Sequence, residues 1–223
     1  MTSRALHFPA FTLGHLTPAE APEASELATL SHLKLAGFQL GLLALPAAIE
    51  DTYYRLGGLP ARIAAHYRGL DPADPDEDIL EEAWEALEGP LAESYLLDEV
   101  VDALFDAFGA LLARATGPVT VRRPGEPGFA VQSPSRRALL LALKRAYREE
   151  WTPARVTQRL QRTGSLTPES APVIFHHSEV GRDDAASEVA ARLSETPVEA
   201  LADAAAGVIR LRRLDLPADP VTS

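Results

Sequence analysis

The side chains best suited to chemistry in this sequence are carboxylates arranged in two short motifs. Each motif has acidic residues at positions i, i+1 and i+4; the two sets are Glu81, Glu82 and Glu85, and Asp98, Glu99 and Asp102. Residues three or four apart share one face of a helix, so each motif would present its carboxylates together. Such a group repels itself unless a cation lies between its members, and Mg²⁺ prefers oxygen ligands. The spacing therefore predicts a Mg²⁺ site, with Mn²⁺ as a substitute, and metal-assisted attack of water on a phosphoanhydride.

Two amphipathic helices are expected to carry these motifs. Apolar residues recur every three or four positions over residues 76–87, and again from Leu91 or Ser94 to about Arg114. Only a short connection containing Gly89 separates the two patterns. Helices joined by a short loop are usually antiparallel neighbours, so the two carboxylate sets would face each other across the seam.

The same stretch resembles a known enzyme family. Ile79 to Glu88 reads ILEEAWEALE, and Glu99 to Asp102 reads EVVD. These segments are similar to the EExxE and ExxD motifs of the MazG-like nucleoside triphosphate pyrophosphohydrolases. The resemblance extends over roughly residues 38–117 and includes the turn at 56–60, which is similar to an FGLP-like turn of some members.

This resemblance implies an all-α helix bundle that assembles as a homodimer or higher homo-oligomer. It also implies Mg²⁺-dependent cleavage of a nucleotide between its α and β phosphates, giving a monophosphate and pyrophosphate, as in house-cleaning of the nucleotide pool. The implied metal ligands are Glu82, Glu85, Glu99 and Asp102, with Asp98 as a further candidate. Glu81 and Glu82 would take part in catalysis, with Glu81 as a ligand or as the group that positions the attacking water.

Charge is sharply divided along the chain. Residues 69–113 contain fourteen Asp and Glu and no Lys or Arg, whereas residues 118–170 contain ten Lys and Arg against four acids. The basic residues of one predicted helix are Arg136, Arg137, Lys144, Arg145 and Arg148. They could bind substrate phosphates, from this subunit or across an interface. Alternatively they could bind nucleic acid, with residues 153–164 in a helix-turn-helix, or pair with the acidic block.

Composition excludes several other classes of protein. The absence of cysteine removes disulfides, thiolate metal sites and cysteine nucleophiles. A net charge of −11 argues against a general polyanion binder. The longest apolar stretch, residues 33–49, is broken by Lys34, two glycines and Pro46, so no membrane span is expected. Without a visible targeting signal, a cytoplasmic location is the expectation.

The chain divides into an N-terminal arm (1–23), a MazG-like helical domain (24–117), a basic extension (118–216) and a tail (217–223). Helices are expected over 25–45, 47–56, 135–150, 153–162 and, with a break, 183–214. A small β-hairpin is expected over 119–131, and a short strand over 173–175. The extension contains either a degenerate second MazG-like copy, with acids at Glu188, Glu199 and Asp203, or an unrelated alanine-rich helix pair.

Two further observations leave alternatives open. Tyr53 and Tyr54 precede a glycine turn and could stack on a base, or could simply be buried by packing. The pair His176-His177 is interpreted as surface polarity, because adjacent residues of a strand point to opposite faces. A second function class also stays open, in which the bundle is a non-catalytic dimerisation scaffold and its basic half binds nucleic acid or a protein partner.

Overall fold

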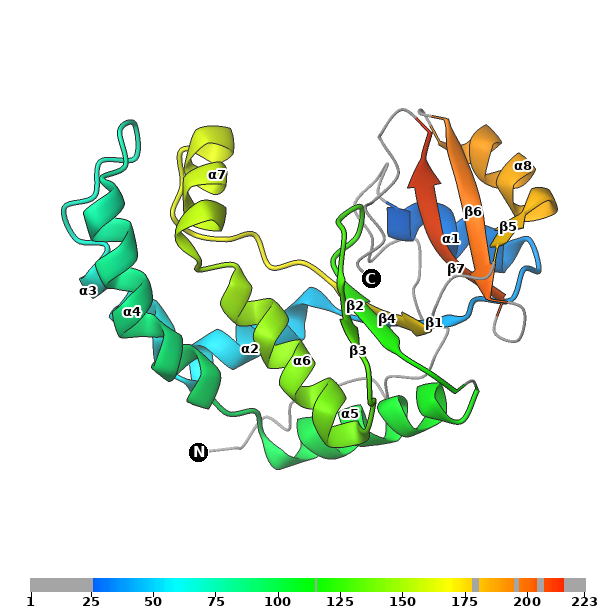
Figure 1. The fold of residues 1–223 in the computed structure, drawn as a ribbon, viewed down its shortest axis with the longest axis horizontal. Coiled ribbons are helices and arrows are strands. Elements are labelled where there is room, and N and C mark those ends of the chain that lie inside the picture. The colour runs from blue at the N-terminus through cyan, green and yellow to red at the C-terminus, as the bar shows by residue number, and fades with distance from the viewer. Residues whose placement is uncertain (1–25, 115, 178–180, 195–196, 204–206, 215–223) are drawn as a thin grey trace, which may run out of the picture.

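The computed structural model describes residues 26–114, 116–177, 181–194, 197–203 and 207–214. These residues form eight helices and seven strands, and the strands make two antiparallel sheets. The expected all-α bundle is therefore wrong, and the fold is mixed α/β (Figure 1). The expected arm (1–23) and tail (217–223) lie outside the described residues.

The helices and strands alternate irregularly along the chain. The helices are α1 (Glu26–Leu35), α2 (Ala47–Leu56), α3 (Leu59–His66), α4 (Glu77–Glu93), α5 (Asp98–Leu112), α6 (Arg136–Glu149), α7 (Pro153–Thr163) and α8 (Asp184–Leu193). The strands are β1 (Leu42–Leu45), β2 (Val119–Arg122), β3 (Phe129–Val131), β4 (Val173–His177), β5 (Gly181–Asp183), β6 (Val198–Asp203) and β7 (Gly207–Arg213).

Local signals account for most of the helix boundaries. Asp76 caps α4 by accepting hydrogen bonds from the backbone N–H groups of Asp78 and Ile79. Ser135 caps α6 in the same way through the N–H of Ala138. Proline at its first position favours the start of α7, and Gly164, with a φ of 66°, ends it. The α4 helix runs past the expected stop and contains Pro90.

The larger of the two sheets has the strand order β1-β4-β2-β3. The expected hairpin forms β2 and β3, and the expected short strand forms β4. The expected helix over 25–45 is wrong in its second half, because α1 ends at Leu35 and Leu42–Leu45 pairs with β4. This four-residue run is entirely apolar, so its periodicity cannot separate a strand from a buried helix.

The expected C-terminal helical region is also mostly wrong. It ends as a helix at Leu193, and β6 and β7 then pair with β5 in the second sheet. Within β6, Val198 and Ala200 enter the small hydrophobic core, and Glu199 between them is also buried and pairs with Arg212. Because Glu199 lies on a strand, neither of the two alternatives for this region, a degenerate second acidic helix pair or an unrelated alanine-rich helix pair, describes it.

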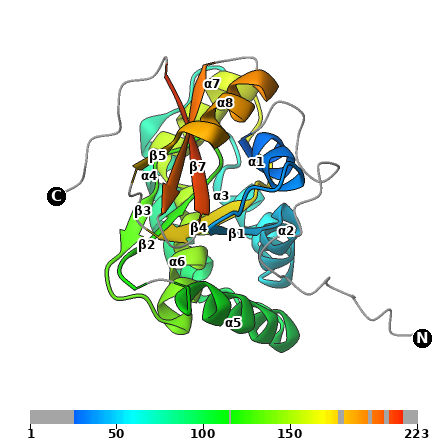
Figure 2. The same cartoon turned by 90° about the vertical axis from the view of Figure 1, so that its right-hand side faces the viewer.

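Two hydrophobic cores lie on opposite faces of the larger sheet. The large core contains residues from β1 through β4, including the buried faces of α2 to α7. The small core joins α1 to α8, β6 and β7 (Figure 2). Neighbouring strand residues serve different cores: Leu43 and Phe175 enter the large one, while Leu42 and Ile174 enter the small one. Residues on both sides of position 118 therefore share the large core.

Among the described helices, none combines the length and apolar character needed to cross a membrane.

Candidate ligand-binding site

The predicted acidic residues lie on two helices that do not face each other. Glu81, Glu82 and Glu85 are exposed on α4, and Asp98, Glu99 and Asp102 are exposed on α5. Figure 1 shows α4 and α5 joined end to end at a steep angle, and each of them packs against α6. The expectation that α4 and α5 are antiparallel neighbours is wrong, because both helices pack against α6 instead of against each other.

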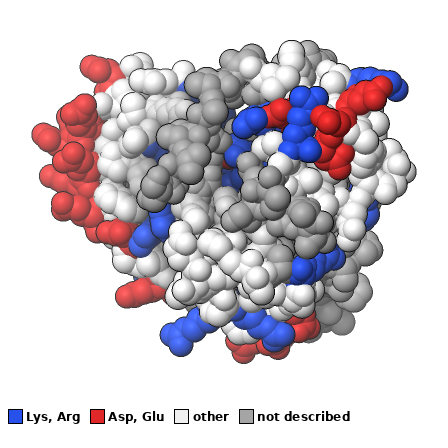
Figure 3. Space-filling view, turned by 45° about the vertical axis from the view of Figure 1, so that its right-hand side comes forward, with Lys and Arg blue, Asp and Glu red and all other residues white. Residues whose placement is uncertain are grey.

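These carboxylates do not form a cation site within one chain. In the part of the chain that the structure describes, no group of three or more His, Asp or Glu side chains is arranged to hold a metal ion. Acidic side chains instead spread along one edge of the molecule, on the side of α4 (Figure 3). The described residues thus do not gather these carboxylates into a Mg²⁺ centre, and the MazG-like chemistry stays a prediction from the sequence.

The predicted phosphate-binding residues on α6 also point to separate partners. The Lys144 ammonium donates to the carbonyl oxygen of Ser94 at 2.6 Å, and burial lowers its pKa. The Arg145 guanidinium pairs with Glu149 at 2.6 Å and lies 3.9 Å from the Phe129 ring centre. These two cations fasten α6 to its surroundings.

The other three cations of the set are equally dispersed. Arg148 pairs with Glu88 of α4 at 3.4 Å, and among the described residues this is the one ion pair of the set with an acid of residues 69–113. The Arg136 guanidinium lies over Gly109 of α5, where a Cβ would stand 2.5 Å from Nη2. Arg137 is exposed. The structure therefore does not bring the five residues together as a phosphate site.

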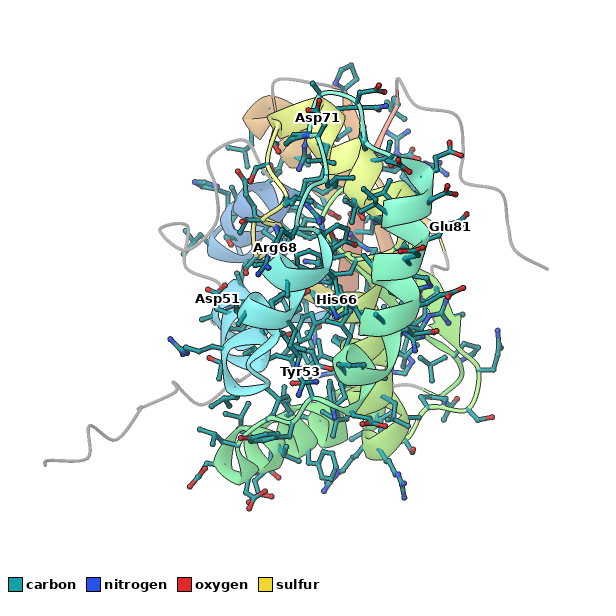
Figure 4. The ribbon with its side chains drawn as sticks, turned by 90° about the vertical axis from the view of Figure 1, so that its left-hand side faces the viewer. Asp51, Tyr53, His66, Arg68, Asp71 and Glu81 are labelled. Carbon is teal, nitrogen blue, oxygen red and sulfur yellow. The ribbon has the colours of Figure 1, made fainter. Side chains whose placement is uncertain are left out.

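A cavity of about 420 Å³ opens on a different side of the large core. It lies among α2, α3, the junction of α6 with α7, and the segment that follows α7. Its lining is mainly apolar and consists of Asp51, Tyr54, Arg55, Pro60, Ile63, Ala64, Trp151, Leu166, Thr167, Pro168 and Ser170. Figure 4 looks onto this side, with Asp51 on α2 near the segment leading from α7 and Glu81 on the outward side of α4.

Aromatic rings form the inner wall of this cavity. Tyr54 and Trp151 meet edge to face, with ring centres 6.1 Å apart. The Tyr67 ring lies 6.0 Å from Trp151. The Tyr54 hydroxyl lies 2.8 Å from the carbonyl oxygen of Tyr147, to which it can donate. Burial, together with the negative charge of Glu50, raises the pKa of Tyr54 well above its ordinary value, so its hydroxyl stays neutral.

A buried ion pair holds the wall in place. Glu50 is fully buried and receives two hydrogen bonds from Arg123, at 2.7 and 3.0 Å. The same carboxylate accepts from the backbone N–H of Ala171 at 3.1 Å, and Arg123 donates to the Ala171 carbonyl at 3.2 Å. Arg123 also pairs with Glu150 at 2.9 Å. The chain segment beside the cavity is thus anchored to α2 and to the end of α6.

The mouth of the cavity is polar. The Ser170 hydroxyl donates to the Asp51 carboxylate, and Arg55 donates to the Thr52 hydroxyl at 3.4 Å. Asp51 and Arg55 are both exposed. The lining thus combines apolar side chains with the carboxylate of Asp51, the guanidinium of Arg55 and the hydroxyl of Ser170.

Sequence reasoning missed most of this site. Tyr54 is the one lining residue for which the sequence suggests ligand stacking as an alternative. Trp151 lies between two helices and belongs to no recognisable sequence motif. The interpretation of His176 and His177 as surface polarity is wrong, because each is only 2% exposed. No protein-family model matches the chain, and no curated protein is detectably similar to it.

Proposed function

We propose that this protein is a small-molecule binding module whose ligand enters the cavity beside Tyr54 and Trp151. The observation that carries the proposal is the cavity itself, which has an apolar body, an aromatic wall and a polar mouth. Its volume of about 420 Å³ falls within the usual range for small-molecule sites, roughly 300–1,000 Å³. A wall fixed by a buried ion pair supports binding, because a preformed site loses little conformational freedom when occupied.

The triphosphatase function implied by the MazG-like motifs is a weaker proposal. Its carboxylates lie on two helices that do not face one another, so ligands from a second copy of the chain would have to complete a metal site. The scaffold alternative also gains little support, since four of the five α6 cations already contact their own chain.

Tryptophan fluorescence offers a direct test of the binding module. The chain has two tryptophans, so Trp84→Phe leaves Trp151 in the cavity wall as the single reporter. Titration with the neutral compounds 2-phenylethanol and cyclohexanol should change Trp151 emission saturably and raise the melting temperature.

A matched pair of variants checks where the compounds bind. Ala64→Leu fills part of the cavity and should weaken binding at least tenfold. Ala65→Leu changes the same helix outside the lining and should leave binding unchanged. If folded Trp84→Phe protein gives no saturable response, or if the two leucine variants behave alike, the cavity is not the binding site.

A further inference from the structure

Two opposite charges stand side by side at the mouth of the cavity. Asp51 and Arg55 lie four residues apart on α2, so they occupy the same helix face, with Cβ atoms about 5–6 Å apart. Both side chains are exposed, and among the described residues neither forms an ion pair. Their hydrogen bonds are to neutral hydroxyls, those of Ser170 and Thr52.

The neighbouring acid on the same helix behaves differently. Glu50 is buried and its charge is matched by Arg123. Asp51 and Arg55 are thus the charged residues of α2 whose head groups face the cavity mouth without a charged partner. A ligand in this cavity would thus have a negative and a positive group beside each other at the mouth and an apolar wall further in.

The geometry points to a zwitterionic ligand with an apolar side chain. Resting on the proposed function, we infer that the cavity binds a hydrophobic α-amino acid or a closely related aminocarboxylate. Its ammonium group pairs with Asp51, its carboxylate accepts from the Arg55 guanidinium, and its side chain fills the space among Ile63, Tyr54 and Trp151. Charge-assisted hydrogen bonds of this kind are stronger than neutral ones.

Ligands with fewer charges match this mouth less well. A neutral ligand would use neither head group, and a simple amine or acid would use one of them and lie close to the like charge of the other. The inference therefore predicts a definite order of affinity among compounds that share one apolar body.

Four compounds built on the same benzyl group provide the test. They are phenylalanine, phenethylamine, 3-phenylpropionate and 2-phenylethanol, titrated into Trp84→Phe protein with Trp151 emission and calorimetry as readouts. Phenylalanine should bind at least tenfold more tightly than any of the other three.

Charge-removing variants of the Trp84→Phe protein identify the contacts. Asp51→Asn should weaken phenylalanine and phenethylamine about tenfold and leave 3-phenylpropionate no weaker, because only the first two lose a charge-assisted hydrogen bond. Arg55→Gln should weaken phenylalanine and 3-phenylpropionate and leave phenethylamine no weaker. Arg62→Gln and Glu93→Gln, which alter exposed charges outside the lining, are the matched controls.

The outcomes separate this inference from the proposed function. Equal binding of all four compounds, or phenylalanine binding that ignores both Asp51→Asn and Arg55→Gln, overturns the zwitterion and keeps the cavity as a binding site. Absence of binding by all four compounds to folded protein overturns both. The crossed pattern of losses with the two variants supports the inference.

Discussion

Two adjacent arginines at the end of β2 serve the two cores of the molecule. Arg122 reaches toward the small core, where it donates to both oxygens of Glu26 at 2.6 and 2.7 Å and to His176 Nε2 at 3.2 Å. Arg123 reaches toward the large core, where it forms ion pairs with Glu50 and Glu150. Successive residues of an extended chain point to opposite sides, which separates these two neighbours.

The two networks differ in what they hold together. Glu26 also accepts from the backbone N–H groups of Gly125 and Leu211, so the Arg122 network joins α1, the β2–β3 turn and β7. The Arg123 network joins α2, the end of α6 and the segment at Ala171 that borders the cavity. The same ion-pair chemistry thus fixes the small core in one case and the wall of the cavity in the other.

Breaking the Arg122 network should have the largest effect. Arg122→Met leaves the Glu26 carboxylate buried without its cation, which should cost about 3–5 kcal/mol of unfolding free energy. Urea denaturation measures this loss, and ligand binding by the protein that stays folded should be unchanged. The double variant Glu26→Gln/Arg122→Met should recover part of the loss; an undiminished loss would show that the charge is not its cause.

Acid should weaken the Arg122 network first. Burial, together with the positive charge of Arg122, lowers the pKa of His176 to about 4. An unfolded histidine has a pKa of about 6.5, so the unfolded chain takes up a proton that the folded chain refuses. The unfolding free energy should therefore fall as the pH drops from about 6.5 to about 4, by up to about 3 kcal/mol from this group.

Two further features sharpen this pH prediction. Burial alone would raise the pKa of Glu26. The charge of Arg122 and the hydrogen bonds that the Glu26 carboxylate accepts outweigh burial and bring this pKa below its ordinary value. Its stabilisation is present above the unfolded pKa and is lost at lower pH than that of His176. His176→Gln should flatten the stability profile between pH 6.5 and 4, as measured by urea unfolding at several pH values. If the unfolding free energy of His176→Gln fell with pH as steeply as that of the wild type, groups other than His176 would cause the pH dependence.

Breaking the Arg123 network should lower the unfolding free energy less than breaking the Arg122 network does, and it should weaken ligand binding more. Glu50→Gln keeps the shape of the side chain and leaves Arg123 paired with Glu150, so we expect a loss of about 2 kcal/mol. The Ala171 anchor weakens at the same time, and 2-phenylethanol should bind several-fold more weakly. Calorimetry measures the affinity of Glu50→Gln and of Arg122→Met for 2-phenylethanol. An equal loss of affinity in both variants would contradict the separate roles of the two networks.

The exposed acids of α4 and α5 should matter least. Glu82→Gln and Glu99→Gln should each change the unfolding free energy by less than about 0.5 kcal/mol, and Mg²⁺ should leave the melting temperature of a monomeric chain unchanged. Pyrophosphate release from a panel of nucleoside triphosphates is the complementary assay. Mg²⁺-dependent release that Glu82→Gln abolishes would instead show that an oligomer assembles the site.

The parts of the fold that the sequence predicts are those with strong local signals. The long amphipathic pattern of α5, the capped start of α6 and the proline-glycine turn between β2 and β3 each carry their own information. The strand β1 does not, because its partner β4 lies far along the chain. The strands β6 and β7 pair with each other over a short connection, but the alanines of β6 do not favour a strand. Tertiary pairing decides their structure.

The candidate site could be predicted even less. The carboxylate spacing on α4 and α5 is correct along each helix, but the angle between the helices depends on α6, which follows them in the chain. The cavity is lined by residues from separate segments, and of these the sequence indicates ligand stacking for Tyr54 alone. Hydrophobic periodicity predicts which face of one helix is buried. A cavity depends on how several helices and loops pack, which the periodicity of a single helix does not predict.

The composition of the small core has a consequence for synthesis of the protein. Leu27, Leu30 and Leu33 of α1 pack with Val198, Val208 and Leu211. At roughly 5–20 residues per second, the ribosome reaches β7 on the order of ten to forty seconds after it has finished α1. During that interval the leucine face of α1 lacks its final covering, so a nascent chain stalled before β6 would present it to chaperones and proteases.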